Sequence, residues 1–432
     1  MMREPPSPMP QPYHHDPPRD PWKITLALAA CMALQMTSFV MILPLFARRL
    51  SDFGAGVDAL GLSALAYALA ATLAAPFLGS LADRIGRRPL VLGSLAVYAL
   101  AFTGFLLAGS AEVFVLVRGL AGGFTAGLIP AVMGIVADIA PADRRAQYVG
   151  VVNGGASLGW VIGPLIGGFL YDRWGYAIPF GMSVGIAALA LVLAGFTVPE
   201  THALARSLQR PSGASAPRRS LSAYLEPYRA SGRLQALAVL LLIAFGVLFA
   251  WAFIEPQLMF YAYDELEWTS GQLGLAMSVY GLAVALGEFA LGGWSDRFGR
   301  KPILVLGLVL FTAQFGGLVL SGSFIWIAVG FVVAGLGNAL FDPALNALFL
   351  DLAPEAHKSE VMGMKSTASS LGSTLGPALV VLLTPQLLPR QVFLLALLMV
   401  LILAAAAGLT LRGLGGRGSA RSPAFPADAS DP

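Results

Sequence analysis

Long, uninterrupted runs of apolar residues dominate the chain, and polar residues gather in short stretches between them. A run of about 20 apolar residues is long enough to cross the hydrocarbon core of a bilayer. Lipid offers the backbone no hydrogen-bond partner, so such runs must form helices. The sequence therefore predicts an all-α membrane protein with twelve transmembrane helices, at about 24–47, 57–80, 89–108, 112–138, 147–170, 177–197, 235–262, 270–294, 302–321, 324–350, 361–384 and 391–411.

Three segments outside these runs have a different composition. Residues 1–22 are rich in proline and have no apolar core, so we expect a disordered cytoplasmic tail rather than a signal peptide. A second disordered cytoplasmic tail is expected at 413–432. Residues 201–233, rich in Pro, Gly, Ser and Arg, are predicted to form a cytoplasmic linker. This linker divides the chain into an N-terminal six-helix bundle at 23–200 and a C-terminal six-helix bundle at 234–412.

Composition and charge agree with a membrane location. The chain is 57% hydrophobic and only 12% charged, whereas soluble domains carry roughly 25% charged residues. Most of its 27 Lys and Arg residues fall on the side of the predicted termini, and the loops on the other side hold only Arg48, Arg49, Arg173 and Arg390. By the positive-inside rule, both termini are expected in the cytoplasm of a protein of the plasma (inner) membrane. The positive charges are dispersed, so no nucleic-acid partner is expected.

A charged phrase occurs twice, as GSLADRIGRRPL at 79–90 and as GGWSDRFGRKPI at 292–303. The same offset of 213 residues relates further glycines, prolines and acids, among them Pro130 to Pro343 and Asp138 to Asp351. A constant offset over so many positions predicts two structurally similar halves. The repeated residues of the phrase are Gly79, Asp83, Arg84, Gly86, Arg87 and Pro89, matched by Gly292, Asp296, Arg297, Gly299, Arg300 and Pro302.

Two six-helix halves that each carry this phrase resemble the major facilitator superfamily, whose loop signature lies between helices 2 and 3 and between helices 8 and 9. The resemblance covers nearly the whole chain outside the tails. It implies a conformational latch, formed by the two phrases together with Arg88 and Asp138, that holds the halves together when the cytoplasmic side is closed. The glycines would allow a tight turn, and the arginines could bind carboxylates such as Asp138. A purely topogenic role would explain the arginines but not the aspartate or the glycines.

The fifth predicted helix contains a glycine pattern, GVVNGGASLGWVIGPLIGG at 150–168. Gly159, Gly163 and Gly167 fall on one helical face, which would let another helix approach closely. Ordinary helix packing would explain this face. The whole spacing, however, resembles the signature of the twelve-helix drug–proton antiporter group, which implies export. The residues of this helix-5 interface are Gly150, Gly159, Gly163, Pro164, Gly167 and Gly168.

Ionisable residues inside predicted transmembrane helices are functional candidates, because charge is costly in hydrocarbon. They are Arg118, Glu255, Glu288, Asp342 and Lys365. Arg118 opens RGLAGGFTAGLIP, which is similar to a family element linked to proton transfer; the alternative is a structural arginine that extends to the membrane interface. For Glu288 and Lys365 we favour a structural role, in which the two side chains could form an ion pair with each other.

The candidates for proton coupling are Asp342, Glu255 and Arg118; because the first helix has no acid, coupling would use Glu255 or Asp342, or be absent. Asp342 shares a polar helical face with Asn338 and Asn346, and Glu255 lies among aromatic residues, where an ionised carboxylate is costly. In one respect the sequence departs from the antiporter pattern: its first helix has no acid, and Gln35 is the most polar residue there.

The cavity between the halves is expected to be lined by aromatic residues and methionines with few charges. The candidates for the substrate cavity are Asn338, Asn346, Gln35, Phe253, Phe341 and Met36, with Phe39, Phe124 and Met259 as further aromatic or methionine residues. Each of these residues could equally serve ordinary helix packing.

The sequence thus predicts a monomeric, proton-coupled exporter of lipophilic small molecules, cationic ones included, that works by alternating access, with protons as the coupling ion. The alternative is a nutrient or metabolite facilitator or symporter on the same fold, and a non-transporting membrane sensor is less well supported. No enzyme activity, cofactor or metal site is expected, because the sequence has no His/Cys metal spacing, no nucleotide-binding loop and no nucleophile triad.

Overall fold

The computed structural model describes residues 20–141, 143–201, 228–229, 232–354, 357–383 and 386–411. Within this part of the chain the secondary structure is helical, and twelve helical segments are long and apolar enough to cross a membrane. This confirms the predicted all-α class and the number of spans. Most of the predicted tails and linker lies outside the described residues.

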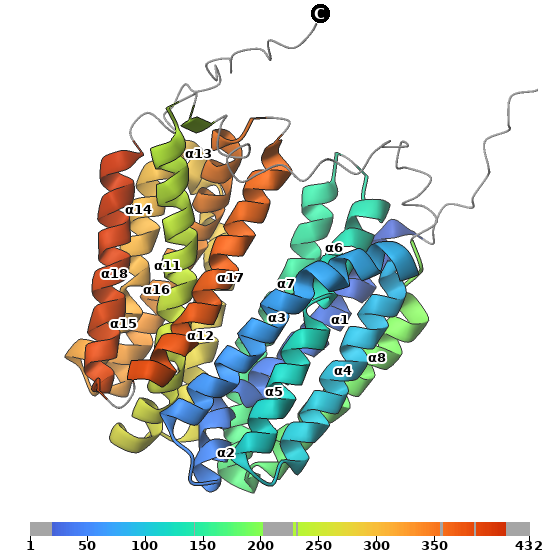
Figure 1. Cartoon of the computed structure of the whole chain (residues 1–432), viewed down its shortest axis with the longest axis vertical. Coiled ribbons are helices and arrows are strands. Elements are labelled where there is room, and N and C mark those ends of the chain that lie inside the picture. Colours follow the sequence, from blue (N-terminus) through green and yellow to red (C-terminus); the bar gives the residue numbers. More distant parts are fainter. Residues whose placement is uncertain are drawn as a thin grey trace, which may run out of the picture.

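The first half of the chain folds into one helical bundle, shown from blue to green in Figure 1. Two of its spans are broken into shorter helices. The first span turns at Pro44 through the short helix η1, and the fourth breaks between Thr125 and Leu128. The elements are α1 (Pro21–Ile42), η1 (Leu43–Leu45), α2 (Phe46–Asp52), α3 (Val57–Ile85), α4 (Arg87–Leu107), α5 (Ala111–Thr125), α6 (Leu128–Ile139), α7 (Arg145–Trp174) and α8 (Ala177–Thr197).

The second half forms the other bundle, shown from yellow-green to red. Its elements are α11 (Leu234–Phe260), η2 (Tyr261–Glu265), α12 (Ser270–Leu291), α13 (Trp294–Phe298), α14 (Arg300–Phe311), α15 (Ala313–Leu320), α16 (Phe324–Leu352), α17 (Lys358–Leu383) and α18 (Pro389–Thr410). The ribbons of the two bundles lie close together at the end marked by α2 and separate toward the end marked by α6 and α13 (Figure 1). The latter end, where α1 begins and α18 ends, is called the termini side below.

Glycines allow α7 to pack against α1 at backbone distance. A Cβ atom added at Gly159 would lie 2.6 Å from the amide nitrogen of Thr37, and one added at Gly167 would lie 1.9 Å from the carbonyl oxygen of Met41. Real Cβ atoms do not approach so closely, so larger residues would separate the helices. The close approach predicted for this glycine face is therefore present.

The other side of α7 packs against α12 of the second bundle. A Cβ atom on Gly168 would lie 2.2 Å from the carbonyl oxygen of Ser270, and one on Gly274 would lie 2.1 Å from that of Pro164. The α7 helix thus joins its own bundle to the partner bundle. On this side of α7 the close packing does not continue toward the termini, because a Cβ atom at Gly150 or Gly154 would have open space around it.

Polar contacts between the bundles also gather away from the termini side. The carboxylate of Asp172, at the end of α7, accepts hydrogen bonds from the first amides of α12, at 2.9 Å from Ser270 N and 2.7 Å from Gly271 N. Arg48 donates to the carbonyl oxygen of Trp268 at 3.1 Å, and the Tyr263 hydroxyl donates to that of Pro44 at 2.9 Å. These contacts hold the bundles together at the end opposite the termini.

Candidate functional site

Two adjoining cavities lie between the bundles. One, of about 790 Å³, is lined from the first bundle by α1, η1, α3, α5, the start of α6 and α7, and from the second by α11 and α17. The other, of about 330 Å³, lies mainly within the second bundle, between α11, α12, α16 and α17. We call them the N-side cavity and the C-side cavity. Trp160, Leu248 and Trp251 line both, so these three residues form the wall that the cavities share.

The N-side cavity brings Arg118 and Glu255 together from opposite bundles. The Arg118 side chain is buried, and its guanidinium carbon lies 5.0, 4.9 and 4.5 Å from the ring centres of Phe39, Phe46 and Tyr67. The guanidinium is therefore held inside the protein by cation–π contacts and does not extend toward a membrane interface. Arg118 and Glu255 are not in ion-pair contact, but they are near enough for their opposite charges to interact.

The C-side cavity contains a polar corner made by three side chains. The Lys365 ammonium lies 3.3 Å from Oδ1 of Asp342 and also donates to the side-chain oxygen of Asn346. The amide nitrogen of Asn346 donates to Oδ2 of Asp342 at 3.0 Å. The helical spacing of Asp342 and Asn346 placed them on one face as predicted, but the partner from α17 was not predicted.

Lys365 therefore corrects one expectation from the sequence. Among the described residues it pairs with Asp342, and no ion pair joins it to Glu288. Glu288 lies within electrostatic reach of Asp342 but lines neither cavity. The pairing differs because Lys365 and Asp342 both face the C-side cavity.

Aromatic rings form much of the C-side cavity, and the sequence revealed only some of them. Asn338 and Phe341, both predicted, are lining residues. Tyr280 was missed: its ring is parallel to that of Trp251, with centres 6.1 Å apart and an interplanar angle of 11°, and its hydroxyl accepts a hydrogen bond from Asn338 at 2.7 Å. The sequence signal that could have identified Tyr280 is that it is the single tyrosine in the eighth predicted helix.

Four of the six predicted cavity residues do not line either cavity; three of them, Gln35, Phe253 and Met36, lie within the helix packing. Gln35 is fully buried, and neither polar atom of its side chain has a hydrogen-bond partner among the described residues. Phe253 is buried and stacks on Phe249, at 5.6 Å between ring centres. Met36 lies against the glycine face of α7 at Gly159. These side chains serve helix packing, which was the alternative stated for each of them.

The further aromatic and methionine residues divide in the same way. Phe39 lines the N-side cavity, whereas Met259 is buried in the core and lines neither cavity. Phe124 is 57% exposed on the outside of the molecule. Asn346 reaches the site only through Asp342 and Lys365 and is not itself a lining residue.

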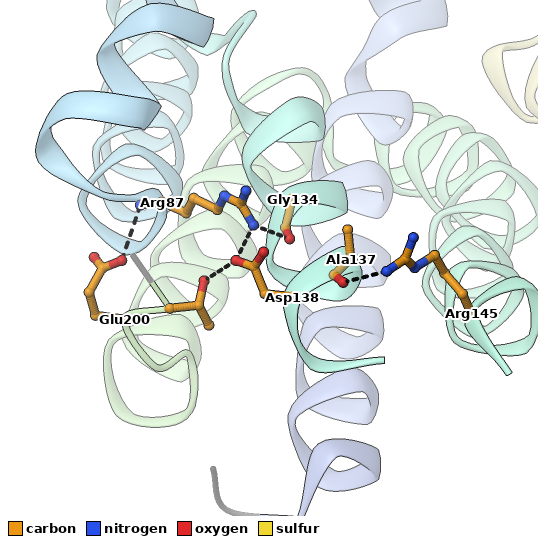
Figure 2. Close-up of polar contacts among 7 residues, drawn as sticks. Arg87, Gly134, Ala137, Asp138, Arg145 and Glu200 are labelled. Carbon is orange, nitrogen blue, oxygen red and sulfur yellow. Dashed lines mark hydrogen bonds and ion pairs between the residues drawn. The ribbon is translucent and has the colours of Figure 1, made fainter. Parts of the chain in front are cut away.

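The first charged phrase forms a polar cluster at the termini side (Figure 2). Gly86 ends α3 with a φ of +103°, a conformation that favours glycine, and the chain turns directly into α4. The Arg87 guanidinium then donates to the carbonyl oxygen of Gly134 and to the carboxylate of Asp138. The hydroxyl of Thr201 donates to the same carboxylate at 2.7 Å.

The second phrase repeats this cluster in the other bundle. Gly299 has a φ of +94°, and Arg300 donates to the carbonyl oxygen of Ala347 at 3.1 Å and pairs with Asp351. Each partner lies 213 residues after its counterpart in the first bundle. In this open arrangement both clusters stay within their own bundle, and Arg88 likewise donates to Gly195 O of its own bundle at 2.7 Å. Asp83 has no described side chain. The latch between the halves stays a prediction for the closed form.

Twelve membrane-spanning helices in two related bundles, with a cavity between them, define a membrane transporter. A sequence model of the Major Facilitator Superfamily matches residues 26–269 and 240–428, and the chain belongs to this superfamily. Because the family consists of transporters, the chain is an integral membrane transporter and not an enzyme.

The chain is similar to several named resistance proteins. It is 28% identical over 319 residues to the class C tetracycline resistance protein of Escherichia coli, which covers 73% of this chain and 77% of that protein. It is 27% identical over 326 residues to multidrug resistance protein 2 of Bacillus subtilis, covering 74% and 78%. Identity to the quinolone resistance protein NorA of Staphylococcus aureus is 24% over 352 residues, covering 78% and 84%.

Solved structures share the fold. The human organic anion transporter MFSD10 (TETRAN) superposes with a TM-score of 0.66 at 22% identity, over 90% of this chain and 100% of that one. A bacterial homologue of the human lysosomal transporter Spinster, described as inward-facing and unoccupied, gives a TM-score of 0.68 at 17% identity, over 90% and 96%. At these identities the likeness concerns the fold alone.

Proposed function

We propose that this chain is a proton-coupled exporter of lipophilic small molecules, which acts as a monomer in the plasma membrane with both termini in the cytoplasm. The observation that carries the proposal is the N-side cavity, which is lined by opposite charges from the two bundles, the buried Arg118 and the half-buried Glu255, beside aromatic rings. The names of the relatives support export, since they are tetracycline, multidrug and quinolone resistance proteins.

The proposed cycle exchanges a proton for cargo. Cargo enters from the termini side, which the positive-inside rule places in the cytoplasm, and binds against the shared wall of the two cavities. Rocking of the bundles closes that side and opens the other. Glu255 or Asp342 then takes up an external proton, which releases the cargo, and loses the proton to the cytoplasm after the return step. Arg118 lines the same cavity and can offset the negative charge of Glu255 whenever that carboxylate is ionised.

The test uses purified protein in liposomes with an imposed pH gradient and fluorescent lipophilic dyes as cargo. The unaltered protein is expected to drive dye against its gradient. Glu255→Gln or Asp342→Asn, whichever removes the carboxylate that carries the proton, is expected to fall to the level of empty liposomes. The amide variants keep the side-chain volume but cannot carry the proton. Glu112→Gln, an exposed acid at the start of α5, serves as the control and should pump normally.

Two results would count against the proposal. If both amide variants pump normally, the protons do not use these carboxylates. Counterflow of a polar solute without any pH gradient would support a facilitator on the same fold instead.

A further inference from the structure

The charged residues that line the two cavities occur in opposite pairs. Asp342 and Lys365 are the charged lining residues of the C-side cavity, and Arg118 and Glu255 are those of the N-side cavity. The remaining lining residues that the structure describes are uncharged. With all four groups ionised, each cavity has a formal net charge of zero, although the chain as a whole carries +3.

In the C-side cavity the negative charge is already engaged. Both oxygens of Asp342 have partners, because Lys365 lies 3.3 Å from Oδ1 and Asn346 donates to Oδ2 at 3.0 Å. Lys365 is tied at the same time to Asn346. The side chain of Asp342 is 48% exposed and that of Lys365 only 17%. Both side chains line the cavity, and the carboxylate is the more exposed of the two.

This arrangement should affect binding differently for cationic and for uncharged cargo. A lipophilic cation that enters the cavity loses water and needs an unpaired anion to compensate for that loss. The anion available there is bound to an ammonium group tethered to the same chain, and a tethered group competes at a high effective concentration. A cargo without net charge meets no such competition. It can stack on the parallel rings of Trp251 and Tyr280, and Asn338 provides a polar contact beside them.

We propose that Lys365 determines the charge of the cargo: by neutralising Asp342, it makes the C-side cavity accept lipophilic aromatic compounds without net charge and reject lipophilic monocations. This inference rests on the proposed function and narrows its substrate class. It differs from the expectation that cationic cargo is accepted, which considered only an aromatic and methionine lining with few charges.

A matched pair of probes tests the proposal. One probe is a fluorescent naphthalimide that carries a tert-butyl group, and the other is the same fluorophore with a trimethylammonium group, which has the same shape and a permanent positive charge. Binding of each is measured by fluorescence anisotropy in detergent at about pH 8, so that carboxylates are ionised. The readout is the ratio of the two dissociation constants. Export of both probes by the unaltered protein is measured in parallel in liposomes under a pH gradient.

The unaltered protein is expected to bind the neutral probe about tenfold or more tightly than the cation, since a desolvated charge pair contributes on that scale. Lys365→Met leaves Asp342 without its counter-ion and should shift the ratio toward the cation by about tenfold or more. Lys365→Arg keeps the charge and should keep the preference for the neutral probe. The double variant Lys365→Met with Asp342→Asn removes both charges and should return the ratio to the neutral preference.

The outcomes separate the two proposals. If the unaltered protein exports lipophilic dyes but binds the cation as well as the neutral probe, or if Lys365→Met leaves the ratio unchanged, export stands and the role of Lys365 is contradicted. If Lys365→Met does not fold, the ratios of the unaltered protein and of the double variant still decide. If the unaltered protein neither binds nor exports either probe, the proposed export function fails, and the inference fails with it.

Discussion

At the residue scale, Asp172 helps to hold the two bundles together on the side opposite the termini. Its carboxylate is a ligand of the α12 N-terminus, although it belongs to α7 of the other bundle. The first amides of a helix lack intrahelical partners and carry a partial positive charge, so a carboxylate is a favourable ligand there. The contact exists only while the two bundles touch at this end.

Asp172→Asn is expected to weaken this closure, because the neutral amide loses the charge and one acceptor oxygen. The measurement uses a Cys31→Ser background, which removes the single cysteine, with Ala64→Cys as a reporter in the N-side cavity wall. A membrane-impermeant maleimide added from the side opposite the termini should label the Asp172→Asn variant several-fold faster. Asp52→Asn is the matched control, since Asp52 pairs with Arg49 of its own bundle. Equal labelling of all three proteins would rule out a role for Asp172 in closure.

The sequence located charged site residues better than apolar ones. A charge within an apolar helix must face a cavity or a partner, so Asp342, Glu255 and Arg118 could be placed at the cavities. Met36 and Phe253 could not be placed, because apolar residues suit lipid, core and cavity alike, and the polar but uncharged Gln35 is buried in the helix packing instead. The pairing of Lys365 with Asp342 depends on how α16 and α17 pack, which helical periodicity within one segment does not report.

At the scale of elements, α7 contacts both α1 and α12, and small residues on its two faces permit this. A Cβ atom at Gly155 would lie 2.2 Å from the carbonyl oxygen of Ala29, whereas one at the neighbouring Gly154 has nothing within 4 Å. Adjacent positions of one helix therefore differ in how much space they offer.

Gly155→Ala and Gly154→Ala form a pair of variants with opposite expected effects. Gly155→Ala must separate α7 from α1 and should cost about 1–3 kcal/mol of stability, as overpacking does. Gly154→Ala should raise stability by up to about 1 kcal/mol through the higher helix propensity of alanine. Thermal unfolding in detergent, followed by tryptophan fluorescence, measures both. Equal melting temperatures for the two variants would contradict the packing described here.

Spans could be predicted as elements, but their internal breaks could not. Run length determined that each span is helical and roughly where it ends. The turn at Pro44 and the break between Thr125 and Leu128 arise within continuous apolar runs. A proline or glycine permits a break there but does not require one, since Pro76 lies inside the unbroken helix α3. The Gly159, Gly163 and Gly167 face was predictable because glycine at every fourth position leaves a groove only another backbone can fill.

At the scale of the whole molecule, the two bundles act as similar bodies joined on one side. The offset of 213 residues relates the Arg87–Asp138 cluster to the Arg300–Asp351 cluster, so the twofold relation was readable in the sequence. Which side is open was not, because a transporter that alternates has one sequence for both states. The contacts of α7 with α12 show that the closed side is the one opposite the termini.

In this account the coupling between proton and cargo is reciprocal. A proton gradient drives cargo across the membrane, and a cargo gradient drives protons. The most direct test is therefore the reverse experiment, with liposomes that enclose a pH-sensitive dye and have no pH gradient at the start. Imposing a gradient of a lipophilic cargo should move protons in the direction opposite to the cargo, and the amide variant that stops pumping, Glu255→Gln or Asp342→Asn, should abolish this movement. Cargo that crosses the membrane while the internal pH stays constant would contradict proton-coupled exchange.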